Sequence, residues 1–308
     1  RNFLPSIGRL VRYQTPRESA SVRIDTGVAE GSEISMYYDP MIAKLVTHGA
    51  DRTEAIARMQ SALDGYYVRG VNHNMAFLAS ILAHPRFAEG RLSTDFIAEE
   101  YPDGYAPEPP QGAILDRFVA IAAVIHMRAG SRGAAGAGRR DWAVRIAGAI
   151  HRVTATVADS ATTLVAYEGR EITVEADWRP GSPLFSGTVD GVPVDAQVDR
   201  RGIGYLLTHA GVEAPVLVFT PRTAELAALM PEKAPPDMSR FLLSPMPGLL
   251  VSLAVAEGTA VRAGEELAVV EAMKMENILR AQADGVVKTL HAAPGDSLAV
   301  DQPIVEFG

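Results

Sequence analysis

Residues 247–308 repeat themselves with a constant offset of 37 residues. Short apolar runs broken by glycines are typical of β-strands. Each half alone would expose an apolar face to water, so we expect the two halves to pack together. The repeat therefore predicts a small, flattened β barrel over residues 241–308. The repeated pairs are Gly248–Gly285, Leu249–Val286, Leu250–Val287, Leu253–Leu290, Gly258–Gly295, Val261–Leu298 and Leu267–Ile304.

A lysine lies where the two halves join, in the segment Glu-Ala-Met-Lys-Met-Glu-Asn at residues 271–277. On a tight turn, the amine of Lys274 is expected to project into solvent. The chain has four lysines and 25 arginines, and an arginine could carry the charge but is not a usable nucleophile. The residues alone leave two interpretations open: a solvated hairpin with surface methionines, or a chemically reactive lysine.

Charge and proline divide the chain into three parts. Formal charge is −3 over residues 1–111, zero over 112–240 and −5 over 241–308, and proline-rich stretches lie near both borders. Proline cannot continue a helix, so these stretches predict connectors. The predicted parts are a mixed α+β domain at 1–105, a domain at 112–230 with a helix at 113–129 and about eight β-strands, a linker at 231–240, and the repeat domain at 241–308.

In the first part, short strand-like runs precede helices. Asp51 can cap a helix, with Glu54 as its capping-box partner and Gly65 at its end. A second helix is expected from about Asn74 to Ala83. A third, short helix is expected to begin at residue 93 or 94.

The middle part opens with a helix that is apolar around most of its circumference, and such a helix needs to be enclosed. About eight short strands follow it, and Asp190-Gly191 is a strong signal for a two-residue hairpin. The pattern predicts an antiparallel barrel or sandwich that encloses the helix.

Composition excludes several classes of function. A net charge of −8 argues against a nucleic-acid binder that relies on a general positive field. The chain has no cysteine, which excludes disulfides, thiolate catalysis and cysteine-ligated metal sites. No apolar segment reaches the ~20 residues that span a bilayer. We therefore expect no nucleic-acid, membrane or metal site.

The Met-Lys-Met segment, together with Pro-Met-Pro-Gly at residues 245–248, resembles the biotin carboxyl carrier domain. This resemblance implies that a biotin ligase attaches biotin covalently to Lys274. It also implies that Met273 and Met275 flank this lysine and shape recognition of the loop. A lipoyl-type carrier has the same type of fold, but its lysine usually lacks the paired methionines, so it stays as an alternative.

The first part resembles the C-terminal part of a biotin carboxylase, and the whole chain looks most like the α subunits of propionyl-CoA carboxylase. The family is that of biotin-dependent acyl-CoA carboxylases, which are ligases. The resemblance implies that Arg23 contacts bicarbonate and biotin, that ATP and Mg serve the complete enzyme, and that the middle part joins a carboxyltransferase β subunit in a hetero-oligomer. The matching segments are residues 1–6, 22–23, 38–45, 51–55, 69–74 and 101–105.

The sequence shows no ATP-grasp body, so we expect these 308 residues to be a C-terminal portion that cannot use ATP alone. A 3-methylcrotonyl-CoA carboxylase α subunit is an alternative, because the acyl-CoA pocket would lie on another chain. A non-catalytic assembly module, in which the lysine has no role, is a further alternative. The expected location is the cytoplasm for a bacterial protein or the mitochondrial matrix for a eukaryotic one.

Overall fold

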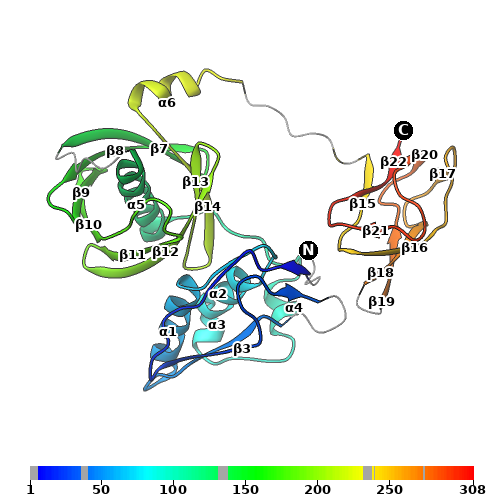
Figure 1. Cartoon of the computed structure of the whole chain (residues 1–308), viewed down its shortest axis with the longest axis horizontal. Helices are drawn as coiled ribbons and strands as arrows, with labels where there is room; N and C mark the ends of the chain where they lie inside the picture. Colours follow the sequence, from blue (N-terminus) through cyan, green and yellow to red (C-terminus); the bar gives the residue numbers. More distant parts are fainter. Residues whose placement is uncertain (1–5, 36–40, 131–137, 232–237, 239, 273–274) are drawn as a thin grey trace.

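The computed structural model describes residues 6–35, 41–130, 138–231, 238, 240–272 and 275–308. Figure 1 shows three parts in chain order: a mixed α/β part that we call the first unit (described residues up to 105), a barrel around a helix, and a separate C-terminal unit of two sheets (residues 240–308). The predicted fold class is thereby confirmed. In the described residues, no helix is both long enough and apolar enough to cross a bilayer.

The first unit combines three two-stranded sheets with four helices, and its core includes Leu10, Ile34, Tyr66 and Val68. Strands β1 and β4, β2 and β6, and β3 and β5 pair antiparallel. Its elements are β1 Gly8–Arg9, β2 Arg12–Gln14, β3 Val22–Thr26, β4 Glu33–Ile34, β5 Ala43–Thr47, α1 Arg52–Asp64, β6 Tyr67–Arg69, α2 Met75–Ala83, α3 Pro85–Ala88 and α4 Phe96–Glu100.

The predicted caps of α1 are confirmed. Asp51 accepts a hydrogen bond of 2.8 Å from the backbone N–H of Glu54, whose own carboxylate accepts one of 2.6 Å from the N–H of Ala50. The first bond satisfies a donor that the helix start leaves free, whereas the second reaches the residue before the N-cap, one position away from the reciprocal bond of a capping box. The sequence analysis missed the short helix α3. Pro85 begins it, because the fixed φ of proline suits the first helical position.

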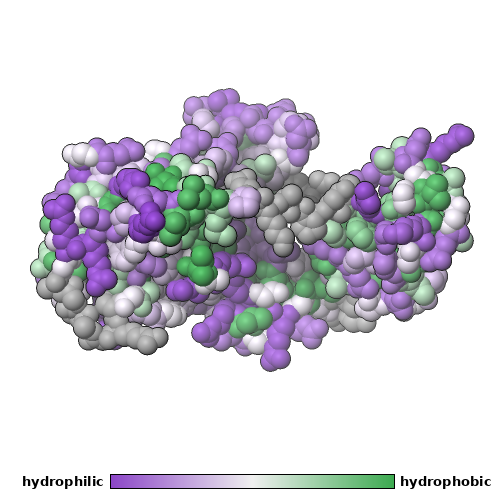
Figure 2. Space-filling model, turned by 90° about the horizontal axis from the view of Figure 1, so that it is seen from above, coloured by the Kyte–Doolittle hydropathy of each residue, from purple (hydrophilic) through white to green (hydrophobic). Residues whose placement is uncertain are grey.

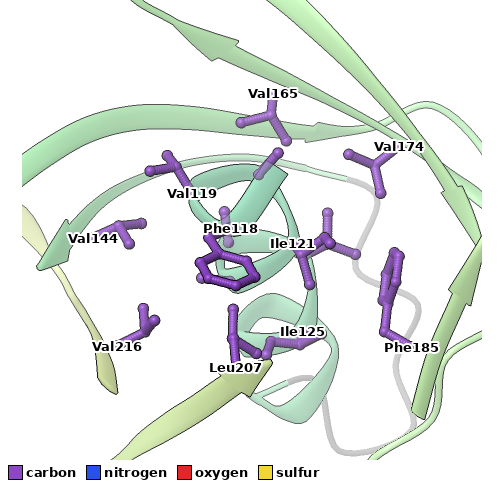
Figure 3. Close-up of a cluster of buried hydrophobic side chains, with 14 of the residues drawn as sticks. Phe118, Val119, Ile121, Ile125, Val144, Val165, Val174, Phe185, Leu207 and Val216 are labelled. Carbon is purple, nitrogen blue, oxygen red and sulfur yellow. The ribbon is translucent and has the colours of Figure 1, made fainter. Parts of the chain in front are cut away.

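Helix α5 (Gly112–Gly130) fills a closed antiparallel barrel of eight strands (Figures 1 and 3). Every residue from Phe118 to Ile125 is fully buried, because strands surround the helix on all sides. The apolar circumference predicted the enclosed helix, and the run of about eight strands predicted a barrel or a sandwich, of which the structure shows the barrel. The strands are β7 Arg139–Ile146, β8 Ala149–Val157, β9 Thr162–Tyr167, β10 Arg170–Ala176, β11 Leu184–Val189, β12 Val192–Arg201, β13 Gly204–His209 and β14 Val212–Phe219.

Two-residue turns join the strands of the barrel in pairs. Asp190 and Gly191 have φ values of +52° and +73°, which is the left-handed conformation that a type I′ hairpin requires. The same signature recurs at three further turns, so the hairpins set the register of half of the strand pairs. These turns are Ala147-Gly148, Glu168-Gly169 and Ala210-Gly211.

A short helix that the sequence did not predict, α6 (Pro221–Ala227), follows the barrel. Thr220 caps it by accepting a hydrogen bond of 3.2 Å from the N–H of Thr223. Leu226, Leu229 and Met230 are exposed at its end and just after it, and Figure 2 shows a hydrophobic cluster over this region.

The C-terminal unit consists of two four-stranded sheets that the 37-residue repeat relates to each other. The strand order is β19-β18-β16-β21 in one sheet and β15-β22-β20-β17 in the other. Adding or subtracting 37 converts each strand pairing of one sheet into a pairing of the other: Leu250↔Val270 becomes Val287↔Phe307, and a bulge follows at both places. The strands are β15 Phe241–Leu243, β16 Gly248–Leu253, β17 Ala260–Val261, β18 Glu266–Ala272, β19 Met275–Arg280, β20 Gly285–Leu290, β21 Ser297–Leu298 and β22 Pro303–Phe307.

Candidate functional site

The candidate modification site lies at the end of the β18–β19 hairpin. Ala272 and Met275 form the last pair of this antiparallel ladder. The two predicted site residues between them, Met273 and Lys274, lie outside the described residues. The side chain of Met275 is exposed, at 64% of its full accessible surface. The hairpin therefore ends at the surface of the C-terminal unit.

Contacts from the segment between β15 and β16 support this hairpin. The amide of Asn277 donates a hydrogen bond of 3.3 Å to the carbonyl of Met275 and lies 3.5 Å from the sulfur of Met246. Met246 is buried, and the fully buried hydroxyl of Ser244 donates a hydrogen bond of 2.7 Å to the Met246 carbonyl. The Pro-Met-Pro-Gly segment thus packs against the hairpin. The sequence analysis included Asn277 in the 271–277 segment but assigned it no role.

Gly248 permits a close approach of two strands beside the hairpin. A Cβ at this position would lie 2.5 Å from the backbone oxygen of Glu271, a distance that real Cβ atoms do not show. Its repeat partner Gly285 has no contact closer than 3.6 Å. The two halves therefore differ: only the half with the lysine hairpin requires a glycine for packing.

The outer faces of the two sheets also differ. On the sheet with the lysine hairpin, Leu249, Val251 and Ile278 are exposed, at 42%, 39% and 49%, and Val269 is half-buried. The repeat equivalents on the other sheet are Val286, Lys288, Phe241 and Glu306, and the lysine and glutamate form an ion pair of 2.6 Å. The hairpin thus adjoins a sheet face that is apolar at all four positions, whereas the other sheet has an ion pair at two of them. Comparing the two repeats position by position would have found it.

Glutamates border the hairpin. Glu271 and Glu276 are both exposed and lie directly opposite each other in the β18–β19 ladder. Like charges in this position destabilise a ladder. The segment 241–308 carries four basic and nine acidic residues, so a protein surface that receives the hairpin is expected to be basic at its rim.

Arg23 lies in β3, opposite Val46 of β5. Its side chain is 67% exposed and forms an ion pair of 3.2 Å with Asp25. Figure 1 shows β3 in the first unit and the β18–β19 hairpin in the separate C-terminal unit. The structure therefore does not bring the two predicted sites together, and no group of three or more potential metal ligands occurs among the described residues.

Three protein-family profiles match successive stretches of the chain. Residues 1–99 match the biotin carboxylase C-terminal domain, residues 118–233 match the propionyl-coenzyme A carboxylase BT domain, and residues 241–307 match a profile described as biotin-requiring enzyme. The matched stretches follow the three parts of the fold. The barrel around α5 corresponds to the BT match.

Curated relatives match the chain from end to end. The propionyl-CoA carboxylase alpha chain of Ruegeria pomeroyi is 44% identical over 100% of this chain and 49% of the relative. The mitochondrial one of Mus musculus is 38% identical over 99% of this chain and 44% of the relative. The mitochondrial methylcrotonoyl-CoA carboxylase subunit alpha of Mus musculus is 28% identical over 99% and 45%.

The chain spans about half the length of the curated relatives that it matches. In this chain, the three matched domains follow one another with at most a short segment between them. The chain therefore belongs to the biotin-dependent acyl-CoA carboxylases, in the α-chain arrangement of propionyl-CoA carboxylase.

Proposed function

We propose that this chain carries biotin, covalently attached to Lys274, between the two active sites of a propionyl-CoA carboxylase. Three features support the proposal: the similarity of the whole chain to about half of the propionyl-CoA carboxylase alpha chains, the match to a biotin-requiring domain, and a hairpin whose last strand pair reaches the surface. The surface position of Met275 carries the most weight, because a carrier must present its group to more than one protein. The complete enzyme would use ATP, Mg and bicarbonate.

Attachment of biotin requires a free amine. The ordinary pKa of a lysine is about 10.4, so the ammonium of Lys274 must lose a proton inside the ligase before its nitrogen attacks an activated acyl group. The new N–C bond forms as the acyl–oxygen bond to adenylate breaks, and AMP leaves. The amide has no charge, so the formal charge of segment 241–308 changes from −5 to −6.

The surrounding residues would hold the modified hairpin in place. Asn277 fixes the backbone of Met275, and Met246 packs beneath Asn277. When attached, biotin supplies the ureido nitrogen that accepts the one-carbon unit. Met273 and Met275 would flank it, and the apolar face with Val251 and Ile278 would contact the proteins that receive it.

Arg23 would bind the anionic reactants at the carboxylase site. A guanidinium stays charged at any working pH and forms paired hydrogen bonds with bicarbonate or a developing oxyanion. The exposure of Arg23 leaves its donors accessible, and its ion pair with Asp25 orients it along β3. The rest of that site would come from residues that this chain does not contain.

Two partners follow from the proposal. A biotin ligase would modify Lys274, and a carboxyltransferase β subunit would bind the barrel in a hetero-oligomer. The exposed Leu226, Leu229 and Met230 next to the barrel suit such a contact, since large apolar side chains at a surface mark interfaces. Relatives occur in bacteria and mitochondria, so we place the protein in the bacterial cytoplasm or the mitochondrial matrix.

Intact mass after coexpression with a biotin ligase tests this function. We expect a gain of one biotinyl group, its loss in Lys274→Arg and its retention in Lys288→Arg, which changes a lysine on the other sheet. Streptavidin binding without incorporation of lipoate would dismiss a lipoyl carrier. No gain of mass in the parent chain would contradict the proposal. Carboxylation assays with the β subunit of each enzyme would then show whether the complex acts on propionyl-CoA or on 3-methylcrotonyl-CoA.

A further inference from the structure

Three of the five buried polar or charged side chains in the described part of the chain lie where the first unit meets the barrel. They are Asp64 at the end of α1, Gln197 on β12 and His209 on β13. Figure 1 shows the barrel resting on the helices of the first unit. Burial of polar groups is unfavourable unless partners satisfy them. The partners of Asp64 and Gln197 come from across the boundary.

The carboxylate of Asp64 depends on the barrel. An acidic residue at the C-terminal end of a helix is disfavoured by the helix dipole, and the last turn of α1 has no basic residue. One oxygen of Asp64 accepts a hydrogen bond of 2.7 Å from the backbone N–H of Ala210. The other oxygen lies 2.8 Å from Nδ1 of His209. Both partners belong to the barrel, so the first unit alone does not account for Asp64.

The ring of His209 extends this contact into the core of the barrel. Its Nε2 lies 3.2 Å from the guanidinium of Arg117 on α5. A guanidinium can only donate, so Nε2 accepts and Nδ1 carries the hydrogen. Nδ1 therefore donates toward the carboxylate of Asp64 at 2.8 Å, with the backbone carbonyl of Asp195 as a second acceptor at 2.9 Å. The three residues connect α1 of the first unit with the helix inside the barrel.

A second group of contacts lies beside the first. Arg69 donates a hydrogen bond of 3.0 Å to the carboxylate of Asp199 and another of 3.0 Å to the side-chain oxygen of Gln197. The side-chain amide of Gln197 donates a hydrogen bond of 2.9 Å to the carbonyl of Tyr66. The hydroxyl of Tyr67 donates a hydrogen bond to the carboxylate of Asp199. Because the Arg69 guanidinium donates charge-assisted hydrogen bonds from more than one nitrogen, these bonds fix the relative orientation of the two units as well as their distance.

The turn between β13 and β14 closes the contact. Gly211 has a φ of +76°, and a Cβ there would lie 2.6 Å from the Cβ of Ala79 on α2. Gly169 occupies the same place in another hairpin, with a φ of +77°, and has no atom within 4 Å of its ideal Cβ. The two glycines share a backbone conformation, but only Gly211 packs against the first unit.

The geometry points to a rigid interface between the first unit and the barrel, which we call the joint. In it, the Asp64–His209 and Arg69–Asp199 pairs are positioning residues for the carrier. They hold the first unit and the barrel in one orientation. Helix α1 contacts β3 and β5, so the strand with Arg23 is tied to the same joint. The inference rests on the proposed function, because the joint sets where the connector to the C-terminal unit begins relative to Arg23.

Distance measurements on the full chain test the joint. The chain has no cysteine, so spin labels can be placed with Leu92→Cys and Val192→Cys, at two exposed positions in the two units. We expect one narrow distance distribution, which Gly211→Ala broadens and Gly169→Ala leaves narrow. The matched glycine controls for backbone strain.

Asp64→Asn supplies a second test without a change of size. In either orientation its NH2 group would face a donor, the N–H of His209 or that of Ala210, so one hydrogen bond is lost and the distribution broadens. In a complete carboxylase, Asp64→Asn should lower overall carboxyl transfer about tenfold through misplacement of the carrier, while biotin-dependent ATP cleavage stays unchanged. Narrow distance distributions in both Gly211→Ala and Asp64→Asn would contradict the proposed joint. Failure of the proposed function is distinct, since it appears as missing biotin on Lys274 and leaves these distances unaffected.

Discussion

Lys288 donates a hydrogen bond of 2.6 Å to Glu306 on the outer face of one sheet of the C-terminal unit, at the positions that Val251 and Val269 occupy on the other sheet. The strand pairings and bulges around both pairs are equivalent. The fold therefore accepts either an ion pair or two apolar side chains at these positions. The fold does not require the apolar pair next to the lysine hairpin, so we attribute this pair to the proposed contact with another protein.

Exchanging the two faces tests this explanation. The double variant Val251→Lys with Val269→Glu copies the other sheet, so we expect its free energy of unfolding to change by less than ~1 kcal/mol. Loss of apolar contacts at a docking surface should slow biotin attachment or carboxyl transfer about tenfold. Hydrogen exchange measures the free energy of unfolding, and the time course of biotin incorporation measures the rate of attachment.

The reverse exchange is the matched control. Lys288→Val with Glu306→Val changes the sheet without the hairpin, and we expect normal rates of biotin attachment and carboxyl transfer. Equal slowing by both exchanges would show that the apolar face has no special role.

Arg23 and Arg12 offer a matched comparison for the carboxylase site. Both are exposed, at 67% and 60%, and each forms one ion pair of 3.2 Å, with Asp25 and Glu30. Exposed pairs contribute about 0–1 kcal/mol, so neither Arg23→Ala nor Arg12→Ala should affect folding much. In a complete carboxylase, Arg23→Ala should lower biotin carboxylation by at least about 100-fold. Normal activity of Arg23→Ala, or an equal loss in Arg12→Ala, would remove Arg23 from the site.

The sequence predicts those parts of the fold that leave a local or periodic pattern. The apolar circumference of α5 predicts an enclosed helix, and the 37-residue offset predicts two similar sheets. The joint between the units leaves no such pattern. Asp64 looks like an ordinary last residue of a helix, and its partner His209 lies 145 positions further along the chain. Contacts of this kind depend on how finished units pack, so the structure alone shows them.

The helix inside the barrel should dominate its stability. Ile121 is fully buried on α5, and Ile121→Ala should lower the free energy of unfolding by about 2–5 kcal/mol, because it removes apolar contacts and leaves a cavity. Ile150→Ala makes the same change at a position that is 43% exposed, and we expect less than ~1 kcal/mol. Both tryptophans, Trp142 and Trp178, lie in the barrel or its loops, so urea unfolding followed by fluorescence reports on it. Equal losses would contradict the enclosed helix.

His126 makes the stability of the barrel depend on pH. Burial, together with the charge of Arg200, lowers the pKa of His126 below its usual value of 6.5. The ring contacts Trp142 edge-on at 4.9 Å between centroids. The folded pKa lies below the unfolded one, so the unfolded chain binds the proton more readily. The contribution of the neutral His126 ring to the stability of the folded barrel is complete above pH ~6.5 and is lost as the pH falls below that value.

We therefore expect the urea midpoint of the barrel to decrease from about pH 7.5 to about pH 5, and to decrease less in His126→Gln, whose side chain does not titrate. His48→Gln removes a histidine of the first unit and should keep the slope of the parent. The slope of the midpoint against pH is the informative quantity, since the substitution itself can change stability at every pH. A slope in His126→Gln as steep as that of the parent would show that other groups cause the dependence.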